Sequence, residues 1–563
     1  MSQAATEPNN MLVPAVSGTA MLICVQLASR LFIFASNQMI LRSLSPSTLG
    51  IAAQVDLFLI SIIYFSRESI RAAIQRQPVQ SSSATSITLQ DTVSSSDKSK
   101  TETQATSSQS IVNMSYLSIV MGFVVSLTSV ALYLHFVSIE VSETAYYRAS
   151  VAVTAAAALI ELGSEPFFAV LQHYMLYSKR AAVEISAAFF KNLITSGVSM
   201  WAAWGGHSLG ALPFALGHLS YSLILFGGYY LAAIYQSSSW HFSLLPLPIK
   251  PSDKSAYFAD RFPRHLLSLS ANVFIQSVVK HLLTQGDSLI LAAMTNLQDQ
   301  GIYSLASNYG GLLARILLQP IEESSRNIFS SLLSSREGRS RDANIGTAKA
   351  LLLNIMRAYM VMLVLIIPLG PTLAPSVLHF LGGPRWTAPE VSDLLALYCY
   401  YVPFLAFNGI CEAFVSSTAS PAQLRKQAAW MALFSALFVL TAYIFLSIGG
   451  LGARGLVYAN IVNMSARIIW SFSFIKQYLH QNKFDLELQE FALRPQTYTA
   501  GAIVTALLSV SKSNVEPYMA SKPFIIGAFY VLIVLYCERE HIMTHYDKIY
   551  RFMKAKEPRA KTK

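Results

Sequence analysis

Long apolar stretches recur from one end of this chain to the other, and they limit its possible folds more than any other feature. Hydrophobic residues make up 53% of the 563 residues and charged residues only 13%, about half the charged fraction of an ordinary globular domain. A helix needs about 20 mainly apolar residues to cross a bilayer. The sequence therefore predicts an all-α polytopic membrane protein and argues against a soluble enzyme.

The apolar stretches predict fourteen transmembrane helices. The predicted spans are 17–40, 47–65, 111–137, 149–172, 181–204, 209–235, 265–296, 302–323, 347–369, 391–418, 427–448, 455–475, 497–511 and 523–537.

The distribution of Lys and Arg between the predicted loops indicates the orientation of the chain. If the N-terminus is cytosolic, the loops on that side and the C-terminal tail carry 28 Lys and Arg residues, and the opposite loops carry six. Cytosolic loops of membrane proteins are enriched in these residues. We therefore expect both termini in the cytosol, and we interpret the net charge of +11 as a signal of membrane orientation and not of nucleic-acid binding.

Two hydrophilic connections divide the predicted spans. Residues 78–110 are rich in Ser and Thr and nearly free of large apolar residues, which predicts a disordered cytosolic loop. A second, proline-containing connection predicts a linker between two six-helix lobes. The predicted domains are an N-lobe at 1–235, the linker at 236–264, a C-lobe at 265–478, and two further helices with a basic tail at 479–563.

Polar residues inside the predicted spans reveal an internal repeat. The first span carries three of them on one helical face, and the seventh span repeats their spacing 250 residues later. The two sets are Gln26, Arg30 and Asn37, and Gln276, Lys280 and Asp287. Glu161 and Glu412 follow with an offset of 251. A six-helix unit duplicated in tandem gives two pseudo-symmetric lobes, which we expect to enclose a central cavity.

Arg30 and Lys280 are the most informative of these residues, because a charge near the middle of a bilayer costs about 2.5 to 3.5 kcal/mol on insertion scales and is expected to face protein or water. Two cations facing one cavity suit a doubly charged anion such as pyrophosphate. The alternative is that internal carboxylates neutralise the cations, for example Asp287 beside Lys280 or Glu161 beside Arg30.

The eighth span adds a further polar face, formed by Arg315, Gln319 and Glu322, with Pro320 expected to kink the helix. At the cytosolic ends of the lobes, Glu322 and Glu323 are candidates for a gate with basic residues, although a solvated helix end explains them equally well. The basic candidates, together with a neighbouring carboxylate, are Arg67, Glu68, Arg71 and Arg326.

Glu161 and Glu165 lie four residues apart in the fourth span. Such a carboxylate pair is able to bind a proton or a sodium ion for coupled transport. We prefer the interpretation that it supplies counter-charges, with Glu161 opposite Arg30.

Motifs for catalysis and for metal binding are absent from the sequence. It has no HExxH or other metal-ligand spacing, no GxxxxGK phosphate loop and no GxSxG elbow. Its four cysteines are widely separated. We therefore predict no catalytic residues, no metal site and no cofactor.

The segment from Lys280 to Phe329, KHLLTQGDSLILAAMTNLQDQGIYSLASNYGGLLARILLQPIEESSRNIF, resembles the Rft family, the "requiring fifty-three" proteins of the eukaryotic endoplasmic reticulum. Shorter matches are SRLFIFASNQMILR, FSRESIR, ELGSEPF, NGICEAF and ANIVNMSARI. The resemblance implies the multidrug/oligosaccharidyl-lipid/polysaccharide exporter fold, with fourteen helices. Its characteristic polar residues fall on Arg30, Arg67, Glu68, Glu161, Glu165, Lys280, Asp287, Gln300, Asn308, Arg315, Gln319, Glu322, Glu323 and Glu412.

The resemblance also implies a function, the translocation of pentamannosyl-chitobiosyl-diphosphodolichol to the lumenal leaflet for N-glycosylation, without ATP hydrolysis. The expected partners are this dolichol-linked oligosaccharide lipid, membrane lipids and other N-glycan assembly proteins. Three alternatives differ in class: an accessory protein that binds the lipid without flipping it, a cation-coupled drug exporter, and a membrane glycosyltransferase. The last is disfavoured because the first lumenal loop, RSLSPST, carries no carboxylate.

Overall fold

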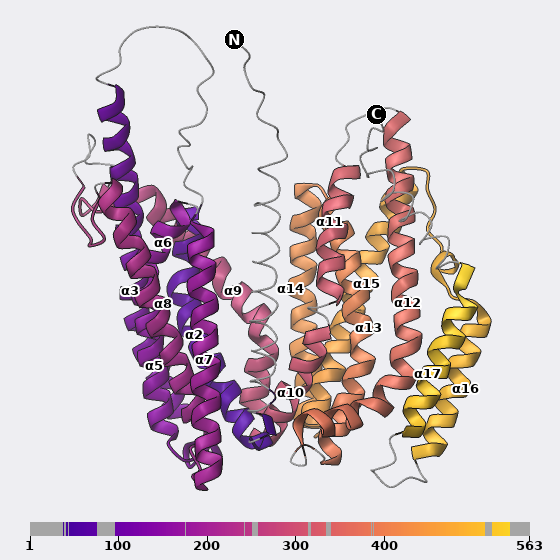
Figure 1. The fold of residues 1–563 in the computed structure, drawn as a ribbon. Coiled ribbons are helices and arrows are strands. Elements are labelled where there is room, and N and C mark those ends of the chain that lie inside the picture. The colour runs from indigo at the N-terminus through magenta and orange to yellow at the C-terminus, as the bar shows by residue number, and fades with distance from the viewer. Residues whose placement is uncertain are drawn as a thin grey trace, which may run out of the picture. The chain divides into compact units, whose positions relative to one another are not determined.

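The computed structural model describes residues 38, 41–42, 44–75, 96–174, 176–240, 242–249, 257–313, 317–333, 339–383, 386, 388–512 and 521–540. Over these residues the chain is almost entirely helical and contains a single short β-hairpin. Backbone contacts divide the chain into two compact units, residues 1–292 and 293–563. Each unit is described by itself (Figure 1).

The first unit is a bundle in which α8 contacts both α5 and α7, and α2 packs against α3. The hairpin pairs Tyr257 with Pro263 and Phe258 with Phe262 in antiparallel register. The elements are α2 (Pro46–Gln75), α3 (Ser96–Phe136), α4 (Ile139–Ser142), α5 (Tyr147–Gly163), α6 (Glu165–His173), α7 (Tyr177–Gly205), α8 (Leu212–Trp240), β1 (Tyr257–Phe258), β2 (Phe262–Pro263) and α9 (Arg264–Met294).

The second unit is built around α13, which contacts α10, α11, α12 and α15. Its core includes Phe329 and Phe414, whose ring centroids lie 5.1 Å apart. The elements are α10 (Leu297–Leu313), α11 (Gln319–Leu333), α12 (Arg339–Gly382), α13 (Pro389–Thr418), α14 (Pro421–Tyr443), the π-helical η4 (Ile444–Ile448), α15 (Ala453–Gln481), η5 (Leu488–Phe491), α16 (Pro495–Lys512) and α17 (Ser521–Cys537).

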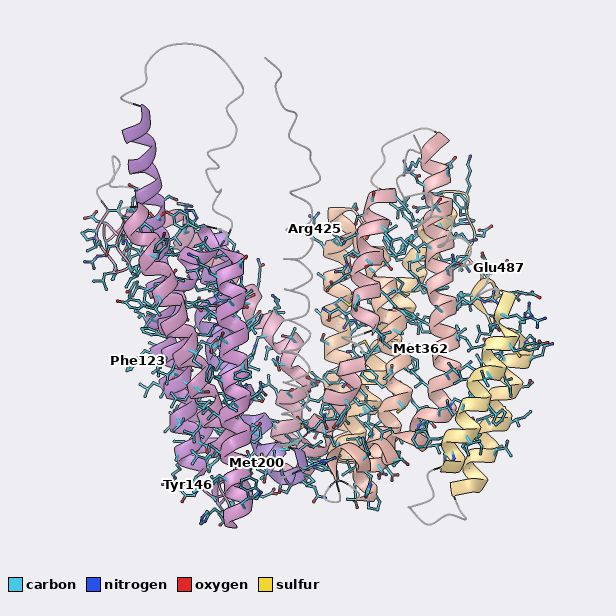
Figure 2. The ribbon with its side chains drawn as sticks, viewed as in Figure 1. Phe123, Tyr146, Met200, Met362, Arg425 and Glu487 are labelled. Carbon is cyan, nitrogen blue, oxygen red and sulfur yellow. The ribbon has the colours of Figure 1, made fainter. Side chains whose placement is uncertain are left out.

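The length and apolar character of the helices make this chain a membrane protein. Among the described residues, six helices are long and apolar enough to span a bilayer. The two parts of α9 are bent by 56° relative to each other, and α9 is a seventh such helix if they form one span. Apolar side chains of α3 are strongly exposed, Phe123 (Figure 2) by 61% and Leu127 by 64%, as expected where a helix faces lipid. Every predicted span from 47–65 onward overlaps a described helix, while most of 17–40 lies outside the described residues.

By its backbone contacts, α9 groups with the first unit. His281 of α9 is buried, with its Nε2 atom 3.0 Å from the Ser61 hydroxyl of α2. Its ring contacts those of Tyr64 and Phe65, at centroid distances of 4.8 and 4.7 Å. The predicted lobe boundary at 236–264 stays a prediction.

The predicted disorder of residues 78–110 is wrong over 96–110, where α3 is already helical. The buried Gln109 side chain donates to the Leu245 carbonyl at 2.9 Å and accepts from the Ser243 amide at 3.0 Å. One turn later, the fully buried Asn113 donates to the Leu247 carbonyl at 2.8 Å. Composition alone did not reveal these long-range hydrogen bonds, which hold the connection after α8 against α3. Residues 76–95 lie outside the described residues.

The two C-terminal helices, α16 and α17, pack on α12 (Figure 1). α12 contains Pro368, which has no N–H group to donate to the Val364 carbonyl. The Tyr530 hydroxyl of α17 donates to this carbonyl at 2.8 Å, and the Tyr530 side chain is fully buried. The Tyr530 hydroxyl of α17 therefore replaces the backbone hydrogen bond to the Val364 carbonyl that Pro368 is unable to form.

Candidate functional site

Lys280, one of the two predicted central cations, lies on α9 and pairs with Glu68 of α2 at 3.2 Å. The Lys280 side chain is 62% exposed, so its ammonium group is accessible in the first unit. The other predicted cation, Arg30, lies outside the described residues, as do Gln26, Asn37 and Arg315. The idea that Arg30 and Lys280 face one cavity stays a prediction.

Two arginines of α2 neutralise the two carboxylates of the fourth predicted span. Arg67 donates to Glu161 at 2.7 Å and to Glu165 at 3.3 Å. Arg71 forms a two-pronged contact with Glu165, at 2.6 and 2.7 Å, and its guanidinium group lies 3.7 Å from the centre of the Phe168 ring. Such bidentate geometry is the strongest form of this interaction.

Among the described residues, Arg67 pairs with Glu161. Arg30, the partner expected from the sequence, lies outside the described residues, so that pairing stays a prediction. Glu161 and Glu165 have side chains only 7% and 2% exposed. A buried carboxylate without a counter-ion costs several kcal/mol, so each requires the arginine beside it. The local reason is helical spacing: Arg67 and Arg71 are four residues apart on α2, as Glu161 and Glu165 are on the α5 and α6 segment.

A cavity of about 380 Å³ lies beside this network, entirely within the first unit. Its lining combines charged, aromatic and aliphatic side chains from α2, α5, α7 and α8. These residues are Asp56, Leu59, Ile60, Ile63, Tyr64, Arg67, Glu68, Arg71, Glu161, Lys191, His218 and Tyr221. Since Lys280 reaches Glu68, it lies at the margin of the same cavity.

Among the lining residues that were missed from the sequence, three are an acid, a lysine and a histidine: Asp56, Lys191 and His218. His218 of α8 is buried, and its Nε2 atom lies 2.5 Å from Asp56 of α2. One signal was available, because Asp56 stands four, eight and twelve residues before Ile60, Tyr64 and Glu68, on one face of a helix. Lys191 gave no such signal, because nothing in its own span indicates what it faces.

Charges in the second unit have a different arrangement. Glu322 of α11 pairs with Arg326 of its own helix at 2.8 Å, and Gln319 donates to Glu323 at 3.1 Å. Glu412 of α13 pairs with Arg467 of α15. The Glu322–Arg326 pair is one of the pairs considered for the predicted gate, while Arg67 and Arg71 hold Glu161 and Glu165 within the first unit. A gate between the predicted lobes stays a prediction.

The remaining predicted polar residues lie on α9 and α10. Gln276 is exposed, and Asp287 is partly buried and accepts a hydrogen bond from the Ser288 amide at 2.8 Å. Gln300 is buried and donates to the Thr295 carbonyl, while Asn308 is exposed. Residues 314–316 of the eighth predicted span lie outside the described residues, so the predicted kink at Pro320 stays a prediction.

Comparison of the fold with solved structures gives membrane transporters. The lipid II flippase MurJ in an inward closed conformation aligns with a TM-score of 0.59 at 12% identity, covering 93% of this chain and 100% of that chain. An inward-facing multidrug resistance MATE family transporter of the MOP superfamily aligns with a TM-score of 0.50 at 14% identity, covering 80% of this chain and 95% of that chain. At these identities the similarity concerns the fold alone.

Comparison of the sequence confirms the predicted family. The Man(5)GlcNAc(2)-PP-dolichol translocation protein RFT1 of Yarrowia lipolytica is 32% identical over 535 residues, covering 90% of this chain and 76% of its own. The protein of the same name from Saccharomyces cerevisiae is 30% identical over 511 residues, covering 86% of each chain. A family model described as "Rft protein" matches residues 15–548. The chain therefore belongs to the Rft protein family.

Proposed function

We propose that this protein moves Man(5)GlcNAc(2)-PP-dolichol from the cytosolic to the lumenal leaflet of the endoplasmic reticulum membrane, as a transporter and not as an enzyme. The observation that carries the proposal is the relationship of nearly the whole chain to translocation proteins of this name, at 32% and 30% identity. The fold shared with a lipid flippase supports it.

The physical task is to carry charges and hydroxyl groups through hydrocarbon. A buried polar group without a hydrogen-bond partner costs several kcal/mol, and an isolated charge costs far more. A lipid that bears a diphosphate and seven sugars therefore crosses extremely slowly unaided. A hydrated, charged cavity inside a helical bundle removes most of this barrier, because the headgroup keeps polar partners while the dolichol tail stays in lipid.

The cavity of the first unit is our candidate for the diphosphate site. Lys280 and Lys191 supply cations, and Arg30 from the first predicted span is a third candidate. Lys280 is well suited to ligand exchange, because its contact with Glu68 is a single, largely exposed ion pair. Arg67 and Arg71 instead hold buried carboxylates and maintain the shape of the cavity.

The size of the cavity limits what it holds. Its volume of about 380 Å³ lies near the lower end of the range for small-molecule sites, about 300 to 1,000 Å³. This space suits a diphosphate and the first sugar, so the remaining sugars must lie outside it.

The transport cycle that we propose is alternating access. It assumes the fourteen helices, the two six-helix lobes with their central cavity, and the cytosolic termini that the sequence predicts. Because the sequence has no nucleotide-binding loop, net flow follows the consumption of the lipid in the lumen.

Transport by the purified full-length protein in liposomes tests this function. The assay measures the translocation of Man(5)GlcNAc(2)-PP-dolichol by wild-type protein and by the Lys280→Ala and Lys280→Arg variants. Lys349→Ala is the control for the loss of an ion-paired lysine outside the cavity, because the partner of Lys349 is Glu490 on η5. We expect translocation by wild type and control, a clear loss in Lys280→Ala and partial recovery in Lys280→Arg.

Other results of this assay point to other functions. Lipid binding without translocation by the wild type contradicts our proposal and favours the accessory protein. Movement of organic cations driven by a proton or sodium gradient favours the exporter.

A further inference from the structure

The cavity contains a histidine–carboxylate pair that the binding of a diphosphate does not by itself require. His218 comes from α8 and Asp56 from α2, and the His218 Nε2 atom lies 2.5 Å from the Asp56 carboxylate. The His218 side chain is only 5% exposed, whereas the Asp56 side chain is 45% exposed. The carboxylate therefore faces the cavity, and the imidazole supports it from behind.

Lys191 of α7 lines the same cavity and interacts electrostatically with Asp56. Among the described residues, Lys191 has no carboxylate within salt-bridge distance. With a neutral His218, the cluster of Lys191, Asp56 and His218 has no net charge. With a protonated His218, it carries one positive charge.

The other charged or titratable groups of the cavity already have partners or stand apart from this pair. Arg67 and Arg71 hold Glu161 and Glu165, and Lys280 holds Glu68. The groups that the packed elements present around His218 are Asp56, Tyr64, Arg67 and Glu68 from α2, Glu161 from α5, Glu165 from α6, Lys191 from α7 and Tyr221 from α8 itself.

We propose that the His218–Asp56 pair is a proton-binding site coupled to anion binding: when a diphosphate occupies the cavity and engages Lys191, His218 takes up a proton. This inference rests on the proposed function of the cavity. An anion that draws on Lys191 leaves Asp56 without its counter-charge and adds negative charge beside it. Protonation of His218 restores the balance, and histidine is the side chain whose charge ordinarily changes between about pH 5 and 8.

Linkage fixes the sign of the effect. If binding takes up one proton, then a lower pH favours the bound state, and the dissociation constant rises up to about tenfold per unit of increasing pH. A diphosphate diester, unlike a phosphate monoester, does not itself exchange a proton near neutral pH. A proton taken up on binding is therefore supplied by the buffer and resides on the protein.

The test is calorimetric titration of the full-length protein in lipid nanodiscs. The probe is a water-soluble diphosphate diester of a short isoprenol and N-acetylglucosamine. Titrations in buffers of equal pH but different ionisation enthalpy give the number of protons taken up per ligand bound. We expect close to one proton at pH 7.5 for the wild type and close to none for His218→Gln, whose amide still donates to Asp56.

The matched control is His480→Gln. His480 also contacts a carboxylate, Asp485 at 3.0 Å, but both side chains are about four-fifths exposed, at 79% and 82%. We expect this variant to take up the same number of protons as the wild type.

Asp56→Asn provides a second test, which does not depend on the folding of the histidine variant. Removal of the carboxylate is expected to tighten diphosphate binding several-fold at pH 8 and to flatten its pH dependence. A purely structural role of the pair predicts the opposite, weaker binding.

The possible failures are distinguishable. Binding without proton uptake by the wild type overturns the coupling and leaves the proposed function intact. Proton uptake that persists in His218→Gln also overturns it, because the proton then resides elsewhere, for example on Glu161. Absence of binding to any variant at any pH overturns both proposals.

Discussion

Arg67 is held between two buried carboxylates, and this position makes its charge a requirement for folding. We expect Arg67→Leu to lower the free energy of unfolding by about 3 kcal/mol, because it leaves Glu161 and Glu165 with less counter-charge in the bundle. Thermal unfolding of the purified variant in detergent measures this loss.

The control for this prediction is Arg454→Leu. Arg454 pairs with Asp393 at 2.9 Å, but both side chains are about half exposed, so the loss is expected to stay below about 1 kcal/mol. Equal losses in the two variants would contradict the importance of burial.

Lys280 differs from Arg67, because its side chain is largely exposed and its ion pair is with a single carboxylate, Glu68. We expect Lys280→Ala to leave stability nearly unchanged and to weaken diphosphate binding roughly tenfold, which corresponds to about 1.4 kcal/mol. Equilibrium binding of the diphosphate diester, beside a thermal unfolding curve, separates the two effects. A variant that is clearly less stable than the wild type but binds the diphosphate diester with unchanged affinity would show that the role of Lys280 is structural.

Sequence reasoning at the residue scale identified which residues carry charge within the membrane but not all of their partners. Glu161 was recognised as a counter-charge, but the sequence did not indicate that Arg67 of α2 pairs with it. Helical spacing shows which residues share a face of one helix. It does not show which face of a second helix lies opposite, and for this reason Lys191 and His218 were missed.

At the scale of elements, the contact between α12 and α17 depends on a hydroxyl group. We expect Tyr530→Phe to reduce stability by about 1 kcal/mol, because the buried Val364 carbonyl beside Pro368 then loses its donor. Tyr536→Phe on the same helix is the control, since the Tyr536 side chain is 65% exposed. A loss in thermal stability of similar size for both variants would contradict this role of Tyr530.

Glu538, just after α17, ties the C-terminal helices to α12. It is buried and accepts hydrogen bonds from Arg357 at 2.8 Å, from the Thr497 hydroxyl at 2.8 Å and from the Arg494 amide at 3.0 Å. Burial acts to raise the pKa of Glu538, but these donors outweigh it and hold the pKa below its ordinary value of 4.5.

A lowered pKa predicts how stability depends on pH. The contribution of Glu538 to the free energy of unfolding is fully present well above pH 4.5, its ordinary pKa. It is lost as the pH falls through the lower pKa of Glu538 in the folded state. We expect Glu538→Gln to be about 1.5 to 3 kcal/mol less stable at neutral pH and to approach the wild type in acid. Thermal unfolding at several pH values measures this difference, and a difference independent of pH would contradict the assignment.

Helix positions were largely predictable because apolar length alone determines them. One exception has a physical cause. The start of α3 is ordered by Gln109 and Asn113, whose partners lie more than 130 residues away.

At the scale of the whole molecule, the family and the transporter fold were predictable from the polar motifs within apolar spans, and the comparisons confirm them. The grouping of α9 with the first unit was not predictable from the repeat. Repeat symmetry assigns α9 to the second half, whereas its contacts through His281 and Lys280 are with α2.

The central claim is that the cavity of the first unit holds the diphosphate of the translocated lipid. A cryo-EM reconstruction of the full-length protein with bound Man(5)GlcNAc(2)-PP-dolichol tests it most directly. Our account predicts diphosphate density within hydrogen-bonding distance of the Lys191 and Lys280 ammonium groups. A well-resolved headgroup bound elsewhere, with this cavity free of lipid, would contradict it.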